Sequence, residues 1–125
     1  MVKSLVAIAV SFALLLGAGI FEWKFVDREF TAFGEEVQTL FDKAEEGTAC
    51  AEDARAVQTS WEARKKKLHV WIPHNDVNKL DDYMAEAVRL IGEKEYPLAL
   101  AKLEILLHLS QCIPGTYRPQ IENIF

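Results

Sequence analysis

A run without charged side chains occupies residues 4–21, close to the start of the chain. It reads SLVAIAVSFALLLGAGIF and is bounded by Lys3 and Glu22. A helix rises about 1.5 Å per residue, so the run covers roughly 27 Å of a hydrocarbon layer that is about 30 Å thick. Trp23 and Phe25 follow where aromatic side chains of a membrane interface are expected. The feature that most limits the fold is therefore an N-terminal helix of membrane-spanning length.

Two interpretations fit this run. A cleaved signal peptide would use Leu5–Leu16 as its apolar region and the small residues at 17–19 as its cleavage region. A membrane anchor would keep the whole run. We favour an anchor at residues 1–23, because the apolar run continues through Ile20 and Phe21, where a mature N-terminus usually turns polar.

Charge is distributed unevenly along the chain. All 19 acidic residues and all but one of the 14 basic residues follow residue 21. An acidic domain of this kind excludes sequence-independent nucleic-acid binding, which depends on clustered Lys and Arg. Basic residues flank the run on both sides and barely discriminate its orientation. A short tail before a long acidic domain favours a single-pass protein of the cell membrane with its domain on the extracytoplasmic side.

Small side chains form one column within the apolar run. Ala9, Ala13 and Gly17 are each separated by one helical repeat of four residues, so they share one face of a helix. Small residues in this pattern let a second helix approach closely inside a membrane. The column predicts helix packing against another membrane protein, with the abundance of Ala and Gly in membrane spans as the simpler explanation.

The rest of the chain has helical periodicity and no competing strand pattern. The first apolar stripe is in phase with Trp23, so the span and the first soluble helix are expected to be one rod that ends at Gly47; the stripe comprises Val26, Phe30, Phe33, Val37, Leu40 and Ala44. Further helices are expected over residues 49–70, 76–92 and 97–113, the last of them apolar around most of its circumference and therefore the most buried. The pattern predicts an all-α fold, in which an N-terminal transmembrane helix precedes an antiparallel four-helix bundle of two helical hairpins over residues 24–125.

The stretch HVWIPHNDVNKLDDY, residues 69–83, is interpreted as a helix junction. Pro73 ends one helix, and Asn75 or Asp76 can cap the next, which places His74 in the connection. Trp71, with the isoleucine after it, is expected to cover the open end of the core next to the membrane.

A metal site is the alternative interpretation of the histidines. His69 and His74 lie at the junction, and His108 and Cys112 on the last helix reach the same end of the bundle, which gives a set of zinc-ligand types. The spacing matches no zinc motif, so we expect no metal and no cofactor. Cys50 and Cys112 are predicted at opposite ends of the bundle, too far apart for a disulfide, which needs Cα atoms within about 7 Å.

The run RKKK at residues 64–67 is the one cationic cluster of the sequence. The simpler interpretation is the solvated face of a helix C-terminus, where the helix dipole favours cations. Since this helix end lies next to the membrane, Arg64, Lys65, Lys66 and Lys67 are also candidates for contact with lipid head groups.

The terminal segment IENIF and the long stretch WIPHNDVNKLDDYMAEAVRLIGEKEYPLALAKLEILLHLSQCIP carry a family resemblance. Together with Trp61 and the N-terminal membrane segment, they resemble the small bacterial proteins of domain of unknown function 4363. The resemblance implies a single-span helical membrane protein and no established activity. From the residues themselves, Ile121, Ile124 and Phe125 are expected to form a last apolar turn, after a turn at Pro114 and Gly115, that folds back over the bundle.

No complete catalytic motif occurs in the sequence. We therefore expect a non-enzymatic, membrane-anchored interaction module that binds another membrane protein. The alternative is a domain that senses a ligand or metal through the histidines and the basic cluster beside the membrane.

Overall fold

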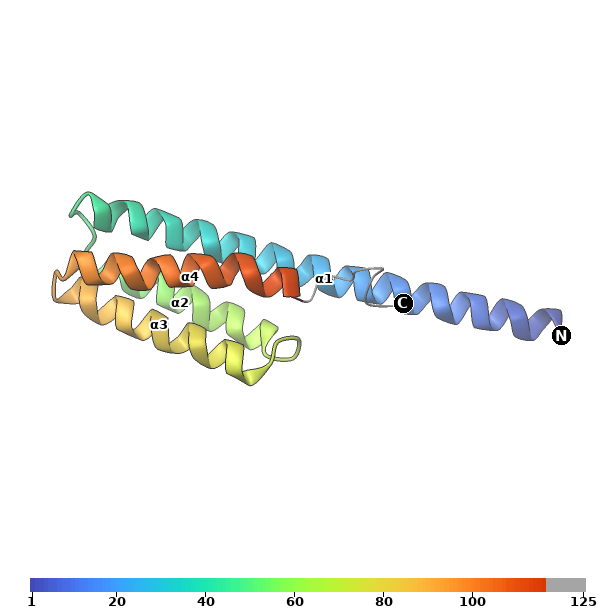
Figure 1. Cartoon of the computed structure of the whole chain (residues 1–125). Helices are drawn as coiled ribbons and strands as arrows, with labels where there is room; N and C mark the ends of the chain where they lie inside the picture. Colours follow the sequence, from blue (N-terminus) through green and yellow to red (C-terminus); the bar gives the residue numbers. More distant parts are fainter. Residues whose placement is uncertain (117–125) are drawn as a thin grey trace.

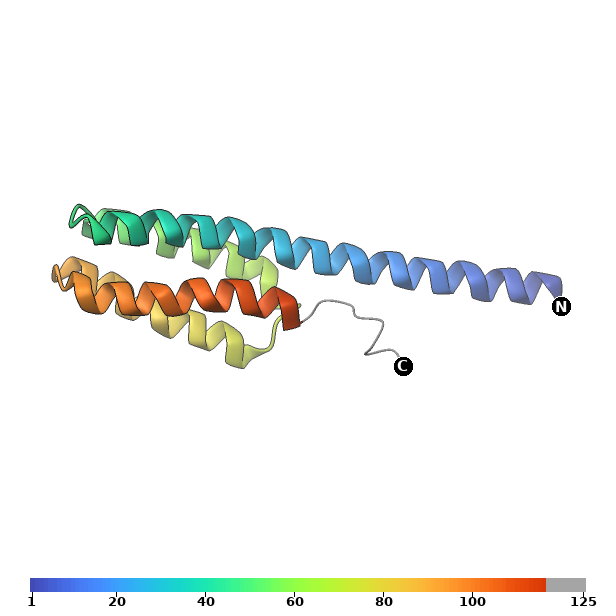
Figure 2. The ribbon, with the colours of Figure 1, turned by 45° about the horizontal axis from the view of Figure 1, so that its top comes forward.

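The computed structural model describes residues 1–116 and shows helices throughout that range (Figure 1). The elements are α1 (Val2–Glu45), α2 (Ala51–Leu68), α3 (His74–Gly92) and α4 (Tyr96–Thr116). Four helices pack side by side as a bundle, and the N-terminal part of α1 extends beyond it as a single rod (Figures 1 and 2). The predicted all-α fold is confirmed.

Helix α1 has two halves with different surroundings. Residues 2–25, the apolar half, contain no buried side chain, whereas residues 26–45, the bundle half, hold the predicted stripe. The buried side chains of α1 are Val26, Phe30, Phe33, Val37, Leu40 and Ala44. Every stripe position expected from the sequence is therefore confirmed, and so is the continuity of the rod through Trp23.

The bundle is a closed ring of antiparallel neighbours. Helix α1 packs against α4 and α2, and α3 packs against α4 and α2. The core is filled mainly by aromatic and branched aliphatic side chains; among the largest fully buried ones are Trp61, Phe30, Phe33, Leu40, Leu68, Leu80, Met84, Ile91, Leu103 and Leu106. Trp61 lies against Phe33, with ring centroids 5.1 Å apart, so α2 inserts its largest side chain into the stripe of α1.

The connections define two ends of the bundle. The far end carries the α1–α2 and α3–α4 turns, where Gly47 has φ 74° and Lys94 has φ 60°. The left-handed backbone conformation explains why glycine follows the predicted end of α1. The near end, from which the apolar half of α1 extends, carries the α2–α3 loop (Figures 1 and 2).

Two expectations for α4 are wrong. The helix continues through Pro114 and Gly115, where a turn was expected. A proline removes only one backbone donor, and α4 accommodates that loss. The helix is also not buried on all sides, since the apolar residues Leu98 and Ala101 are exposed on its outer face. The predicted apolar turn of Ile121, Ile124 and Phe125 lies outside the described residues.

Candidate functional site

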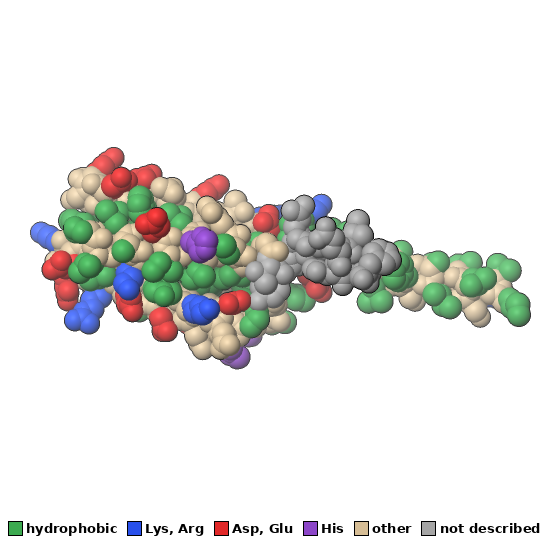
Figure 3. Space-filling model, in the orientation of Figure 1, with side chains coloured by type: hydrophobic (Ala, Val, Ile, Leu, Met, Phe, Trp, Pro, Cys, Tyr) green, Lys and Arg blue, Asp and Glu red, His purple; other side chains and the backbone are tan. Residues whose placement is uncertain are grey.

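The near end of the bundle lies beside the apolar half of α1. The indole Nε1 of Trp23 donates a hydrogen bond of 3.3 Å to the carbonyl oxygen of Pro114. Trp23 therefore ties the end of α4 to α1 about one turn before Val26, the first buried side chain of the bundle half. Figure 3 shows hydrophobic side chains covering the extended part of α1, while charged side chains lie over the bundle. The near end is the place where these two surfaces meet.

Arg64 joins α2 to α1 through two carboxylates. Its Nη1 lies 2.5 Å from Oε2 of Glu29, and its Nη2 lies 2.8 Å from Oε1 of Glu36. The two glutamates are about two helical turns apart on α1, so the guanidinium fork spans both of them. Burial lowers the pKa of Arg64, but the hydrogen bonds to Glu36 and Glu29 raise it by more, and the net shift is upward. Arg64, Glu29 and Glu36 together form a charged link between α1 and α2.

Lys65 and Trp61 share one carboxylate on α3. The buried indole Nε1 of Trp61 donates a hydrogen bond of 2.7 Å to Oδ1 of Asp81. The ammonium of Lys65 lies 2.8 Å from Oε2 of Glu62 and 3.4 Å from Oδ2 of Asp81. The hydrogen bond to Glu62, followed by the charge of Asp81, raises the pKa of Lys65 against the opposing effect of burial. The indole N–H of Trp61, the largest core side chain, therefore has a hydrogen-bond acceptor at the bundle surface.

The basic cluster is divided by these contacts. Arg64 keeps only 19% of its side-chain exposure, so the solvated-face interpretation is wrong for it. Lys65 is half-buried and paired, whereas Lys66 and Lys67 are exposed. Of the four residues considered for lipid contact, the last two have their ammonium groups available, and their contact with head groups stays a prediction.

The junction between α2 and α3 begins its second helix earlier than expected. Pro73 occupies the N-cap position and His74 is the first helical residue, which places Asn75 and Asp76 in the first turn. The predicted side-chain cap by either residue is therefore wrong. An acidic side chain in the first turn still interacts favourably with the helix dipole. Proline suits this position because the backbone donors there have no helical acceptor.

Apolar side chains of the α2–α3 loop point in two directions. Leu68 and Ile72 are buried, and Ile72 closes the core as predicted. Val70 and Trp71 are 69% and 41% exposed, so the expected covering role of Trp71 is wrong. The near end therefore presents an aromatic and a branched aliphatic side chain to the surroundings.

The candidate metal ligands do not come together. His69 Nδ1 lies 2.7 Å from the backbone oxygen of Lys66, and Cys112 Sγ lies 3.4 Å from Nε2 of His108 on the same helix. Across the described range 1–116, no three side chains of His, Cys, Asp or Glu are grouped closely enough to hold a metal ion. The ligand- or metal-sensing alternative stays a prediction.

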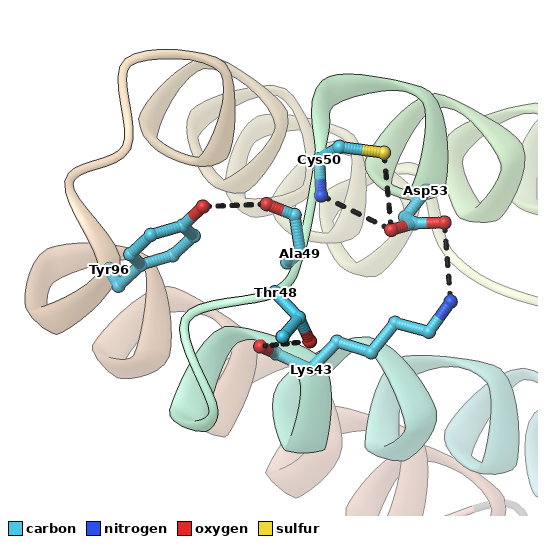
Figure 4. A network of polar contacts seen from close by, with 6 residues as sticks. All are labelled: Lys43, Thr48, Ala49, Cys50, Asp53 and Tyr96. Atoms are coloured by element: carbon cyan, nitrogen blue, oxygen red, sulfur yellow. Dashed lines mark hydrogen bonds and ion pairs between the residues drawn. The ribbon is translucent and has the colours of Figure 1, made fainter.

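The far end is closed by a polar network (Figure 4). Tyr96 on α4 donates a hydrogen bond of 2.7 Å to the carbonyl oxygen of Ala49. Asp53 accepts hydrogen bonds from the backbone N–H and the thiol of Cys50 and pairs with Lys43 at 3.3 Å. The backbone hydrogen bond, then the thiol and Lys43, hold the pKa of Asp53 below its ordinary value. Three helices are joined here, and Lys43 and Asp53 also line an open pocket of about 260 Å³ between α1 and α2.

The two cysteines are exposed and are not joined by a disulfide. Cys50 precedes α2 at the far end, and Cys112 lies in the last turns of α4 toward the near end. The antiparallel order of the helices therefore separates the two thiols along the length of the bundle, as the sequence predicts.

Two surfaces are left largely uncovered by the rest of residues 1–116. Ala9, Ala13 and Gly17 are exposed on the apolar half of α1, and a Cβ added at Gly17 would have no atom within 4 Å. The outer face of α4 carries a row of mostly apolar or small residues, interrupted by one histidine, at alternating spacings of three and four; these are Leu98, Ala101, Ile105, His108 and Cys112, of which Ile105 is half-buried. Residues with this spacing line one side of a helix, as in a coiled-coil seam. Both surfaces have the geometry for packing against another helix.

Comparison with known proteins gives a family and no closer relative. No curated protein and no solved structure matches the chain. A family profile matches residues 29–124, which include the bundle half of α1 from Glu29 onward together with α2, α3 and α4, and leaves out the apolar half of α1. Since the match covers most of the sequence, the chain belongs to the family described as Domain of unknown function (DUF4363).

Proposed function

We propose that the chain is a non-enzymatic, membrane-anchored interaction module. The apolar half of α1 crosses the membrane, and the bundle is held beside it to bind another membrane protein. One observation carries the proposal: α1 is a single helix in which the uncharged run at residues 4–21 has no side chain buried by residues 1–116, whereas its second half supplies a stripe of the core. The anchor and the bundle therefore share one rigid element.

Lipid accounts for the exposed side chains of the apolar half. Large apolar residues cover it on all sides, for example Ile8 and Phe12 on one side and Val6 and Val10 on the opposite side. A helix that is apolar all round must be buried, either in a large core or in a membrane, and the bundle offers it no core. A bilayer solvates such side chains and leaves the backbone hydrogen bonds of the helix intact.

Alkaline carbonate washing of membranes tests the anchor. We expect the full chain to stay in the membrane pellet, because the run at residues 4–21 has no charged side chain. Release into the supernatant of a chain that begins near Ile20 would instead show a cleaved signal peptide and would end the proposal.

Thiol labelling tests the side of the membrane. Both cysteines are exposed, so an impermeant maleimide added to intact cells should modify them if the bundle is extracytoplasmic. The variant Cys50→Ser/Cys112→Ser gives the background. Labelling only after the cells are broken would place the bundle in the cytoplasm.

Partner binding is assigned to the small-residue column of α1 and the outer face of α4. Cross-linking in membranes followed by purification should lose a partner when Ala13→Ile fills the column or Ala101→Glu charges α4. Ala7→Ile and Ala63→Glu are the matched controls, since Ala7 lies off the column and Ala63 is exposed on α2. Equal losses in the controls, or no loss in any variant, would remove these surfaces from the proposal.

A further inference from the structure

The α2–α3 loop exposes apolar side chains that the fold does not need. Leu68 and Ile72 already close the core at the near end, while Val70 and Trp71 between them project outward. Exposure of an aromatic and a β-branched residue side by side in a loop has no benefit for the folding of this chain. Tryptophan is the side chain that membrane–water interfaces favour most, because its ring is apolar and its N–H is polar.

The contacts on the page fix the height of this loop relative to α1. Trp61 on α2 lies beside Phe30 and Phe33 on α1, with ring centroids 6.3 and 5.1 Å away, so these residues are level with each other along the bundle. From that level α2 continues for seven residues, at about 1.5 Å each, to its end at Leu68, roughly 10 Å nearer to the near end. The same distance along α1, in the opposite sequence direction, ends between Trp23 and Val26. The α2–α3 loop, which holds Val70 and Trp71, therefore lies at the end of the bundle from which the apolar half of α1 extends (Figures 1 and 2).

Charge complements this position. Lys66 and Lys67 are exposed on the last turn of α2, immediately before the loop, and neither forms an ion pair within residues 1–116. Elsewhere the domain is acidic, so a cationic edge next to exposed apolar residues is local to the near end. Lys and Arg near a bilayer surface are attracted to anionic lipid phosphates, whereas acidic side chains are not.

We propose that the α2–α3 loop is a second membrane contact, in which Val70 and Trp71 enter the boundary between head groups and acyl chains of the bilayer that α1 crosses. Lys66 and Lys67 lie against the phosphates of anionic lipids. This inference rests on the proposed membrane anchor. A protein that crosses the membrane with one helix can rotate and tilt about that helix. A second membrane contact at the side of the bundle fixes which face the bundle presents to a partner.

Site-specific labels in the full chain, reconstituted in vesicles, test the contact. In the Cys50→Ser/Cys112→Ser background, a spin label is placed by Leu14→Cys, Val70→Cys or Leu98→Cys, each at an exposed position. Collisions with oxygen report lipid and collisions with a water-soluble nickel chelate report water. The label at position 14 reports on the proposed membrane span, and the label at position 70 reports on the α2–α3 loop. The label at position 98, at the far end, is the aqueous control.

Vesicles with anionic lipid should give a Val70 label that collides more with oxygen than with nickel, whereas the Leu98 label behaves in the opposite way. A Leu14 label in lipid with a Val70 label as wet as Leu98 would overturn the second contact and leave the anchor standing. A Leu14 label in water would end both proposals. A Val70 label hidden from both reagents would place protein over the loop and overturn the lipid assignment.

Lysine variants test the charge contribution. Each lysine near an anionic surface is worth about 1 kcal/mol, so Lys67→Gln should lower the ratio of docked to undocked loop about fivefold on anionic vesicles. On zwitterionic vesicles the same variant should change nothing, and Lys94→Gln at the far end should be silent on both. An equal effect of Lys67→Gln on the two vesicle types would overturn the role given to the phosphates.

Discussion

The two halves of α1 have the same backbone conformation and opposite surroundings. In the apolar half Phe12 is 62% exposed, whereas in the bundle half Phe33 is 1% exposed. Apolar residues surround the first half on all sides and form one stripe on the second. The difference shows that backbone hydrogen bonds make both halves helical, whereas the pattern of side chains decides which surroundings each half requires.

The boundary between the halves is marked by polar contacts. Trp23 donates its indole hydrogen bond to Pro114, and Glu29 receives the guanidinium of Arg64 about two turns later. The bundle is therefore tied to α1 directly beside the apolar half, and α1 crosses this boundary as one continuous helix.

The largest expected difference between the halves is the effect of removing a phenylalanine ring. Phe33→Ala deletes a ring that lies 5.1 Å from the Trp61 centroid, and we expect a loss of about 3–5 kcal/mol in the free energy of unfolding. Phe12→Ala should leave it unchanged. Urea unfolding of the full chain in detergent micelles, followed by helicity, measures both. Equal effects would contradict the division of α1 into two halves.

A smaller effect is expected at the charged link of the bundle half. Arg64→Met leaves Glu29 and Glu36 without their cation, and unpaired buried groups cost about 1–3 kcal/mol each. We expect a total near the lower part of that range, because Arg64 is partly exposed and water screens the remaining charges. Arg55→Met, at an exposed position of α2, is the matched control.

A triple variant separates charge from packing. Adding Glu29→Gln and Glu36→Gln to Arg64→Met removes the orphaned charges and should restore most of the lost stability, because buried ion pairs can be replaced by neutral side chains at little cost. If the triple variant is as unstable as Arg64→Met alone, the loss comes from the missing guanidinium hydrogen bonds and not from the orphaned charges of the glutamates.

Much of the fold follows from the sequence because single-helix periodicity is local. The buried stripe of α1 and the buried positions of α3, such as Leu80 and Met84, repeat every three or four residues and need no knowledge of the neighbouring helix. Helix ends are less predictable. Pro114 was expected to end α4, but one proline removes one hydrogen bond, and the surrounding helix tolerates that loss.

The near end is the part that the sequence predicts least well, because its contacts join distant residues. Arg64 falls in the stripe of Ala54, Trp61 and Leu68, which signals a buried cation, but nothing local identifies Glu29 and Glu36 as its partners. The exposure of Trp71 likewise depends on Ile72 taking the place in the core. Adjacent loop residues compete for one position, and composition does not say which one is buried.

The smallest expected effects compare one glycine in each half of α1. Alanine is favoured over glycine in a helix by about 1 kcal/mol. A Cβ at Gly34 would lie 3.0 Å from the hydroxyl of Ser110, which donates a 2.7 Å hydrogen bond to the oxygen of Leu107. Room for the methyl group requires Ser110 to turn away and lose that bond, which costs about 1 kcal/mol.

Gly34→Ala alone should therefore change the free energy of unfolding by less than about 0.5 kcal/mol, since the gain in helix propensity is offset by the lost hydrogen bond. In the Ser110→Ala background the same substitution should recover the full gain of about 1 kcal/mol, because no hydroxyl then meets the new methyl group. Gly17→Ala has open space around it and should leave bundle unfolding unchanged in either background. A full gain from Gly34→Ala without the serine variant would show that α1 and α4 approach each other less closely than the contact with Ser110 implies.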